Sequence, residues 1–108
     1  MSRKLKANNE LLFKIFGVSI HTYIILFLYR NRDFFGTLSD IARALNLTHA
    51  SVRKVVDDLA EIRILKKIRI GNSIVVQFDH EGPFTKPLLE FLEKIHQVEE
   101  VRKVEFKR

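Results

Sequence analysis

The sequence predicts a small, mostly helical α+β domain, in which two helices joined by a tight turn are followed by a two-stranded hairpin. Three observations predict this fold class. Apolar residues recur at helical spacing on both sides of a short turn at residues 46–48. Two runs rich in β-branched residues then flank Gly71 and Asn72. Amphipathic segments before and after this unit predict extra N- and C-terminal helices.

The paired helices follow from capping and turn residues. Thr37 and Asp40 form a capping box, in which the hydroxyl accepts from a free backbone N–H and the carboxylate favours the positive helix end. Asn46 is expected to end the first helix, because it tolerates the left-handed conformation well. Thr48 can cap the second helix. The predicted apolar stripes are Leu38, Ile41, Ala42 and Leu45, then Val52, Val55, Val56 and Leu59. A plain helical hairpin, as found in many bundles, is the alternative.

The β-hairpin is predicted over residues 64–78. A three-residue loop sorts the side chains best, because it pairs Ile70 with Ile74 and gathers the apolar residues on one face. A two-residue loop would mix charged and apolar side chains on both faces. Lys67 and Arg69 are therefore expected on the solvent face near the tip.

A helix beginning after Ser19 is apolar on nearly every side, which predicts that it is buried all round. Its cover is either an N-terminal helix spanning residues 11–16 or a second subunit. The apolar run from Tyr23 to Tyr29 is far shorter than a bilayer span of about 20 residues. We therefore expect no membrane insertion.

The C-terminal segment predicts a helix over 84–101, with Thr85 as its cap and Pro87 in its first turn. A stripe with coiled-coil-like spacing follows, formed by Leu88, Phe91 or Leu92, Ile95 and Val98. This stripe predicts a homodimer through the N-terminal and C-terminal helices. The alternative is a helix that only closes the core of its own monomer. The basic segment 102–108 is either a frayed end or a short strand.

These elements define one domain, residues 1–108. It consists of an N-terminal arm and helix (1–18), a core (19–79), a C-terminal dimerisation helix (84–101) and a basic tail (102–108).

The charge is positive but uneven. The formal net charge is +6 and the pI about 9.8, which suits a polyanionic partner. Residues 1–32 carry six basic and one acidic side chain, whereas residues 33–108 carry thirteen and twelve. Residues 63–69 hold four basic side chains and no acidic one. The chain has no cysteine, which excludes disulfides and thiolate metal sites, so a cytoplasmic, nucleoid-associated protein is expected.

With these parts the chain resembles the winged helix-turn-helix superfamily, particularly small regulators of the MarR, ArsR and PadR type and their archaeal relatives. The resemblance runs from about residue 19 to 79. It rests on Ile24, Ile25 and Leu28, on the segments 38–42 and 48–52, and on the hairpin opening at 64–67. It implies a homodimeric transcriptional regulator that binds double-stranded DNA. The recognition helix, 48–59, would enter the major groove, and the wing, 64–78, would contact the minor groove or the backbone.

The expected DNA-binding residues are Thr48, His49, Ala50, Ser51, Arg53, Lys54, Lys67 and Arg69. Thr48 and Ser51 would position the helix on phosphate. His49 and Arg53 are the expected base readers, because the Arg fork fits the two acceptors of guanine. The acidic pair Asp57-Asp58 departs from this pattern, so DNA contacts should lie in the first two turns of the helix.

Other functions remain open at this point. A DNA-organising or partition protein would spread along DNA, and a winged-helix protein-interaction module would not bind DNA. The histidines match no catalytic motif, so we expect no enzyme activity, cofactor or metal. Residues 79–81 could offer oxygens and an imidazole to a metal, but a polar turn is the expected structure.

Overall fold

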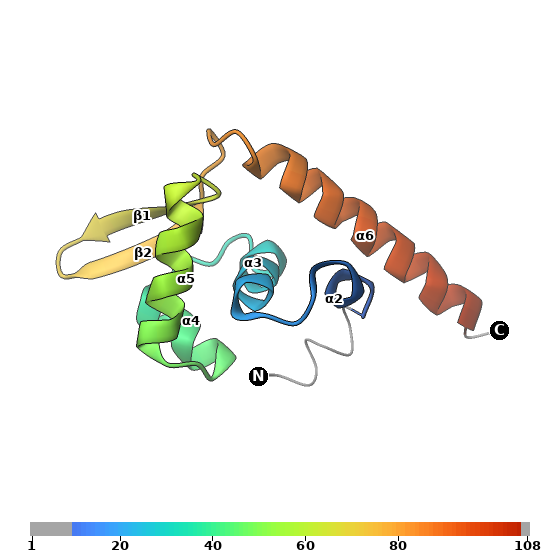
Figure 1. Cartoon of the computed structure of the whole chain (residues 1–108), viewed down its shortest axis with the longest axis horizontal. Helices are drawn as coiled ribbons and strands as arrows, with labels where there is room; N and C mark the ends of the chain where they lie inside the picture. The colour runs from blue at the N-terminus through green and yellow to red at the C-terminus, as the bar shows by residue number, and fades with distance from the viewer. Residues whose placement is uncertain (1–9, 107–108) are drawn as a thin grey trace.

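A computed structural model describes residues 10–106 of the chain (Figure 1). The elements within them are α2 (Glu10–Phe16), α3 (Ile20–Arg30), α4 (Leu38–Leu45), α5 (His49–Glu61), β1 (Leu65–Ile70), β2 (Ser73–Phe78) and α6 (Thr85–Phe106). The predicted fold class, mostly helical with a two-stranded wing and extra N- and C-terminal helices, is confirmed. The beginning of the N-terminal arm, residues 1–9, and the end of the basic tail, residues 107–108, lie outside the described residues. No helix of the described part is both long and apolar enough to cross a membrane.

The turn between α4 and α5 has the predicted chemistry. The Thr37 hydroxyl accepts from the Asp40 N–H at 3.2 Å, and the Asp40 carboxylate accepts from the Thr37 N–H at 2.9 Å. Asn46 ends α4 in the left-handed conformation, with φ 55° and ψ 49°. The Leu47 N–H then donates to the Ala42 carbonyl at 2.9 Å, which closes the helix end. Thr48 caps α5, as predicted.

Helix α3 lies at the centre of the core. Ser19 caps it by accepting from the Thr22 N–H at 3.2 Å. Its most buried apolar residues are Tyr23, Ile24, Leu26 and Leu28. The same core cluster contains Leu12 and Phe13 from α2 and Leu89, Leu92 and Ile95 from α6, so the chain itself supplies cover for α3. A second subunit is not needed to bury these residues.

Helix α6 is longer than expected and starts differently. It continues to Phe106, so the alternative of a short strand within 102–108 is wrong. Thr85 is not its cap: the Thr85 hydroxyl donates to the Arg63 carbonyl at 3.1 Å and is fully buried. The first helical bond instead runs from the Leu88 N–H to the Phe84 carbonyl at 3.0 Å. Thr85 therefore ties the start of α6 to the end of α5.

A second contact between α6 and the core joins Tyr29 of α3 to Glu93. The Tyr29 hydroxyl donates to Glu93 Oε2 at 2.5 Å. Burial, together with the hydrogen bond and charge of Glu93, raises the pKa of Tyr29 to about 12. The phenol is therefore neutral at physiological pH and remains a donor to α6.

The predicted hairpin register is wrong by one residue. Ile70 pairs with Ser73 and Arg69 with Ile74, so the loop has two residues, Gly71 and Asn72. Gly71 has φ +61°, and among the described residues of this loop it alone has a positive φ, as expected for Gly at the first position of a type II′ turn. This turn favours the two-residue loop and overrides the sorting of side chains. One face of the hairpin therefore mixes basic and apolar residues: Leu65, Lys67 and Arg69 lie opposite Phe78, Val76 and Ile74.

Candidate nucleic-acid interface

Helix α5 carries two rows of exposed side chains, because residues four apart lie on the same side of a helix. The first row consists of His49, Arg53 and Asp57, and the second of Ala50, Lys54 and Asp58. The opposite face is buried through Val52, Val55, Val56 and Leu59. The helix is thus anchored to the core by one face, while both rows remain accessible.

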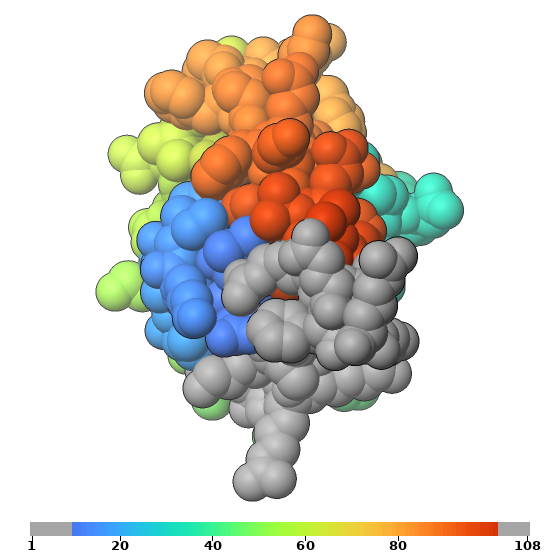
Figure 2. Space-filling model, turned by 90° about the vertical axis from the view of Figure 1, so that its right-hand side faces the viewer, coloured from blue at the N-terminus to red at the C-terminus, as the bar shows by residue number. Residues whose placement is uncertain are grey.

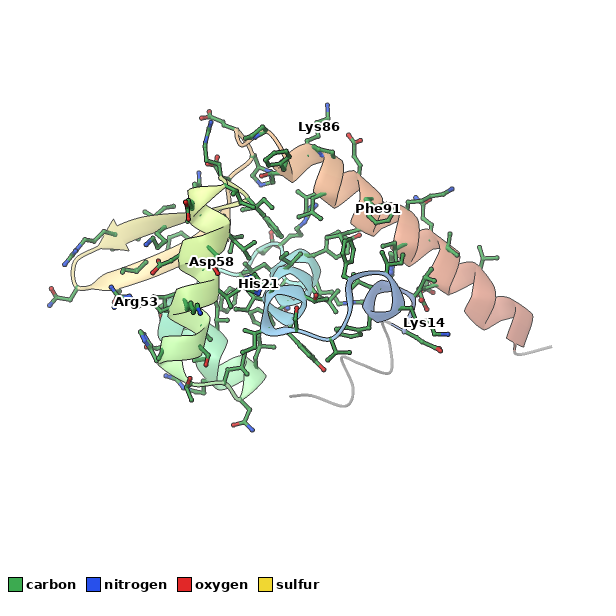
Figure 3. All side chains as sticks on the ribbon, in the orientation of Figure 1. Lys14, His21, Arg53, Asp58, Lys86 and Phe91 are labelled. Atoms are coloured by element: carbon green, nitrogen blue, oxygen red, sulfur yellow. The ribbon has the colours of Figure 1, made fainter. Side chains whose placement is uncertain are left out.

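The first two turns of α5 contain two cations, Arg53 and Lys54, that form no ion pair within residues 10–101. Figure 3 shows Arg53 on the side of α5 nearest the hairpin. Of the sequence-predicted residues, His49, Ala50, Arg53 and Lys54 are all exposed. This part of the site is therefore open to a polyanion.

Thr48 and Ser51 act on the helix itself. The Thr48 hydroxyl donates to the Ser51 hydroxyl at 2.8 Å and accepts from the Ser51 N–H at 3.1 Å. The backbone N–H groups of His49 and Ala50 have no partner among the described residues. A helix start with free N–H groups attracts phosphate oxygens.

A recess joins the first row of α5 to the hairpin tip and to the start of α4. Its polar lining comes from Thr37, Ser39, His49, Arg53, Asn72 and Ser73, and its apolar lining from Leu38 and Ile74. Sequence reasoning missed Ser39, Asn72 and Ser73. Ser39 could have been found from its place in the first turn of α4, whereas the other two required the correct loop length. The recess brings hydroxyl, amide and guanidinium donors together.

Asp40 lies at the start of α4. It follows Ser39 and is hydrogen-bonded to Thr37, and both of these residues line the recess. Hydrogen bonds from the Thr37 N–H and hydroxyl lower the pKa of its carboxyl below 3.8, and Arg43, at 3.6 Å, acts in the same direction. The carboxylate is therefore ionised at neutral pH. Its negative charge interacts with the Thr37 N–H and with Arg43, both close to it in the sequence.

The wing provides fewer free cations than the sequence indicates. Lys67 pairs with Asp57 of α5, with 2.6 Å between Nζ and Oδ1. Arg63 pairs with Asp79 at 3.4 Å. Lys66 lies on the other face of the hairpin, opposite Gln77. Within the described part of the chain Arg69 pairs with no carboxylate, and its Nε donates to the Gly71 carbonyl at 3.4 Å. Arg69 is therefore the wing cation that stays available on the α5 side.

The acidic pair Asp57-Asp58 of α5 is contacted from two sides. Asp57 contacts Lys67 of β1, and Asp58 lies 3.4 Å from Nε2 of His21 at the start of α3. Figure 3 shows His21 and Asp58 directed toward one another. Asp57 and Asp58 thus each have a partner outside α5.

The polar segment 79–81 forms a turn. Asp79 Oδ1 accepts from the Glu81 N–H at 3.1 Å, and Asp79 Oδ2 accepts from Arg63. Among the residues that the structure describes, no group of three or more His, Asp or Glu side chains is placed to hold a metal ion.

Comparison with known proteins supports the fold. No protein-family model and no curated protein matches the sequence. The structure is similar to that of MepR, a transcription regulator of the Staphylococcus aureus multidrug efflux pump MepA. The TM-score is 0.65 at 16% identity, over 94% of this chain and 74% of that chain. It is also similar to the adhesin competence repressor AdcR from Streptococcus pyogenes, with a TM-score of 0.60 at 19% identity, over 99% of this chain and 81% of that chain. The chain therefore has the winged helix-turn-helix fold.

Proposed function

We propose that the protein is a homodimeric transcriptional regulator that binds double-stranded DNA at specific sequences. In this proposal α5 enters the major groove, and the wing, β1 and β2 with their loop, contacts the minor groove or the backbone. The observation that carries the proposal is the start of α5, where Arg53 and Lys54 are exposed and unpaired beside free backbone N–H groups. The two similar structures, a transcription regulator and a repressor, support it.

The residues have different roles in this proposal. Arg53 and His49 read base edges, and Arg53 grips guanine through its two-pronged guanidinium. Lys54 and the helix start, with Thr48 and Ser51, contact phosphate. Small Ala50 allows close approach, and Arg69 of the wing inserts at the minor groove. Ser39, Asn72 and Ser73 add phosphate contacts from the edges of the recess.

The second copy in the proposed dimer packs on α2 and α6. Phe91 and Val98 of α6 are exposed at seven-residue spacing, the spacing of one coiled-coil position, and the exposed Phe84 lies seven residues earlier, just before the helix begins. The Phe91 ring contacts the Phe16 ring of α2 edge-on, at 5.8 Å between centroids. Figure 2 shows α2 and α6 side by side on this end of the molecule. Ile15, Val18 and Val101 extend the same apolar character, with about half of each side chain exposed.

A two-fold axis suits this arrangement. A self-complementary apolar face is buried by a second copy of itself. Two α5 helices related by that axis would read half-sites about one helical turn apart, roughly 34 Å, which favours a palindromic site. A protein of this kind acts at the nucleoid, in the cytoplasm.

Selection of binding sites from random DNA, followed by footprinting, tests the function. We expect a bounded, palindromic footprint, and affinity that falls steeply with salt because phosphate contacts release counterions. A footprint that extends along the DNA would instead indicate a DNA-organising protein. If the protein bound no DNA, the result would instead favour a winged-helix protein-interaction module.

The Arg53→Ala variant tests the proposed base reader. It should weaken binding to the selected site by about 1–3 kcal/mol and relax the preference at one base pair, with little effect on random DNA. Lys86→Ala is the control, because it removes one exposed cation at the start of α6, far from Arg53 in Figure 3. Equal losses on selected and random DNA for Arg53→Ala would contradict its assignment.

A further inference from the structure

Two acidic residues of α5, Asp57 and Asp58, lie at a spacing that allows ion pairs with the proposed DNA-binding cations of the same helix. Asp57 follows Arg53 by four positions, and Asp58 follows Lys54 by four. Side chains four apart on a helix are neighbours, and opposite charges at this spacing attract one another. Capture would neutralise Arg53 and Lys54 within the helix before any DNA is bound.

The structure has both acids turned to other partners instead. Asp57 Oδ1 lies 2.6 Å from Lys67 Nζ, and Asp58 Oδ2 lies 3.4 Å from His21 Nε2. Arg53 and Lys54 form no ion pair with any described carboxylate. Asp57 and Asp58 thus both have partners outside the helix, and neither forms an ion pair with Arg53 or Lys54.

Lys67 is well placed for this role. It stands opposite Val76, which is fully buried, so strand pairing fixes where its side chain leaves the hairpin. Asp57 follows Val56, which is also fully buried, so the core fixes the rotation of α5. Both ends of the ion pair are thus held by packed backbone. At 38% exposure, the Lys67 side chain is more covered than that of Lys14, which is 64% exposed.

We propose that Lys67 is a positioning residue, which holds Asp57 away from Arg53 and so keeps the base reader of α5 free. This role replaces the contact with the minor groove or the DNA backbone that the sequence leads us to expect for Lys67. It rests on the proposed DNA-binding function. This role also explains why the row of α5 that faces the wing contains an acidic residue. Asp57 joins the wing to α5 through its ion pair with Lys67, and Lys67 neutralises the charge of Asp57.

The two roles of Lys67 predict different outcomes. If Lys67 only contacts phosphate, Lys67→Ala weakens binding to selected and random DNA equally, and a second change at Asp57 does not restore discrimination. If Lys67 holds Asp57, Lys67→Ala frees Asp57 to capture Arg53, and binding to the selected site falls more than binding to random DNA. Removing the charge of Asp57 then restores discrimination.

The test is a set of variants whose dissociation constants are measured on a selected site and on random DNA. For Lys67→Ala we expect the ratio of the two constants to fall by roughly 1.4- to 2.3-fold, in line with the modest strength of exposed pairs at this spacing. Lys67→Ala/Asp57→Asn should recover the native ratio, and Lys67→Arg should keep it. Thermal unfolding of each variant checks that the fold is retained.

Asp58 offers a matched control. Lys67→Ala/Asp58→Asn makes the same charge change one residue away, on the row that does not face the wing, and should not restore the ratio. Restoration by both double variants, or by neither, would overturn the role of Lys67. A native protein with no preference for any selected sequence would overturn the proposed function itself, which separates the two failures.

Discussion

Asn46 and Arg63 are the described residues other than glycine that adopt positive φ, and each ends a helix of the helix-turn-helix. Asn46 follows α4 with φ 55°, and Arg63 follows α5 with φ 62°. After each, a backbone N–H reaches back to close the helix: Leu47 to Ala42, and Ile64 to Leu59, both at 2.9 Å. Asn is among the residues that tolerate this conformation, whereas Arg is not. Tertiary contacts must therefore hold Arg63.

Substitution of Asn46 tests the conformational requirement at the turn. Asn46→Gly should leave the free energy of unfolding equal or slightly higher, because Gly adopts positive φ without a Cβ clash. Asn46→Ala should lower it by about 1 kcal/mol. Ala44→Gly, at an exposed position in the last turn of α4, should lower the free energy of unfolding by up to about 1 kcal/mol, unlike Asn46→Gly. Urea denaturation measures all three. Equal losses for Gly at positions 44 and 46 would contradict the prediction.

The capping box at Thr37 gives the helix start a defined dependence on pH. Because its hydrogen bonds lower the folded-state pKa of Asp40 below 3.8, the carboxylate stabilises the fold above that value. This contribution is lost as the pH falls through the folded-state pKa. Asp40→Asn should therefore be less stable than the native protein at pH 7, with a difference that shrinks in strong acid. An NMR titration that places the Asp40 pKa at or above 3.8 would contradict this account.

At the scale of elements, Arg63 organises one junction of the fold. Three parts of the chain meet there: the end of α5, the connection from β2 to α6, and the start of α6. Its side chain pairs with Asp79 and donates to the Glu81 carbonyl at 3.2 Å, and its own carbonyl accepts from Thr85. These contacts explain how an Arg is held at positive φ. They also fix the direction in which α6 leaves the core.

Gly82 is the part of this junction that has no room for a side chain. A Cβ at this position would lie 1.8 Å from the Arg63 carbonyl oxygen, a backbone atom that cannot rotate away. Gly82→Ala should therefore cost roughly 2–3 kcal/mol of stability, by the overpacking mechanism. Gly17→Ala is the control: it has φ +81° and open space, so only backbone strain of about 1 kcal/mol applies. Denaturant unfolding compares them, and a smaller loss at Gly82 than at Gly17 would contradict the prediction.

Local chemistry predicted the elements, but not all of their contacts. The caps Ser19, Thr37 and Thr48 and the helix end at Asn46 were predictable because each acts within a few residues of itself. Thr85, also predicted as a cap, instead bonds to the distant Arg63 carbonyl. The hairpin register was mispredicted although its signal, Gly71 at the first loop position, is present in the sequence. Side-chain sorting failed there because Lys67, on the mixed face, meets Asp57 from another element. Such a partner is known only once the elements are packed, so the contacts of Asp57 and Asp58 could not be predicted from the sequence.

At the scale of the whole molecule, the candidate DNA interface and the proposed dimer surface lie at opposite ends. Figure 1 places the wing and α5 at one end, and α2 with the far half of α6 at the other. Helix α6 serves both its own core and the second surface. Leu92 and Ile95 are buried, whereas Phe91 and Val98 are exposed. The sequence could not assign Phe91 and Leu92 to their faces, because the assignment depends on where α2 and α3 pack.

This division of α6 predicts that association and stability can be separated. Leu92→Ala should cost about 2–5 kcal/mol of stability, because it opens a cavity in the core. Phe91→Glu should leave the monomer folded but prevent dimer formation, since a charge would be buried against the apolar face of a second copy. Ile62→Glu, at a similarly exposed position at the end of α5, should change neither property. Sedimentation equilibrium with thermal unfolding measures both. A native protein that stays monomeric at high micromolar concentration, or a Phe91→Glu variant that still dimerises, would show that α6 closes only its own monomer.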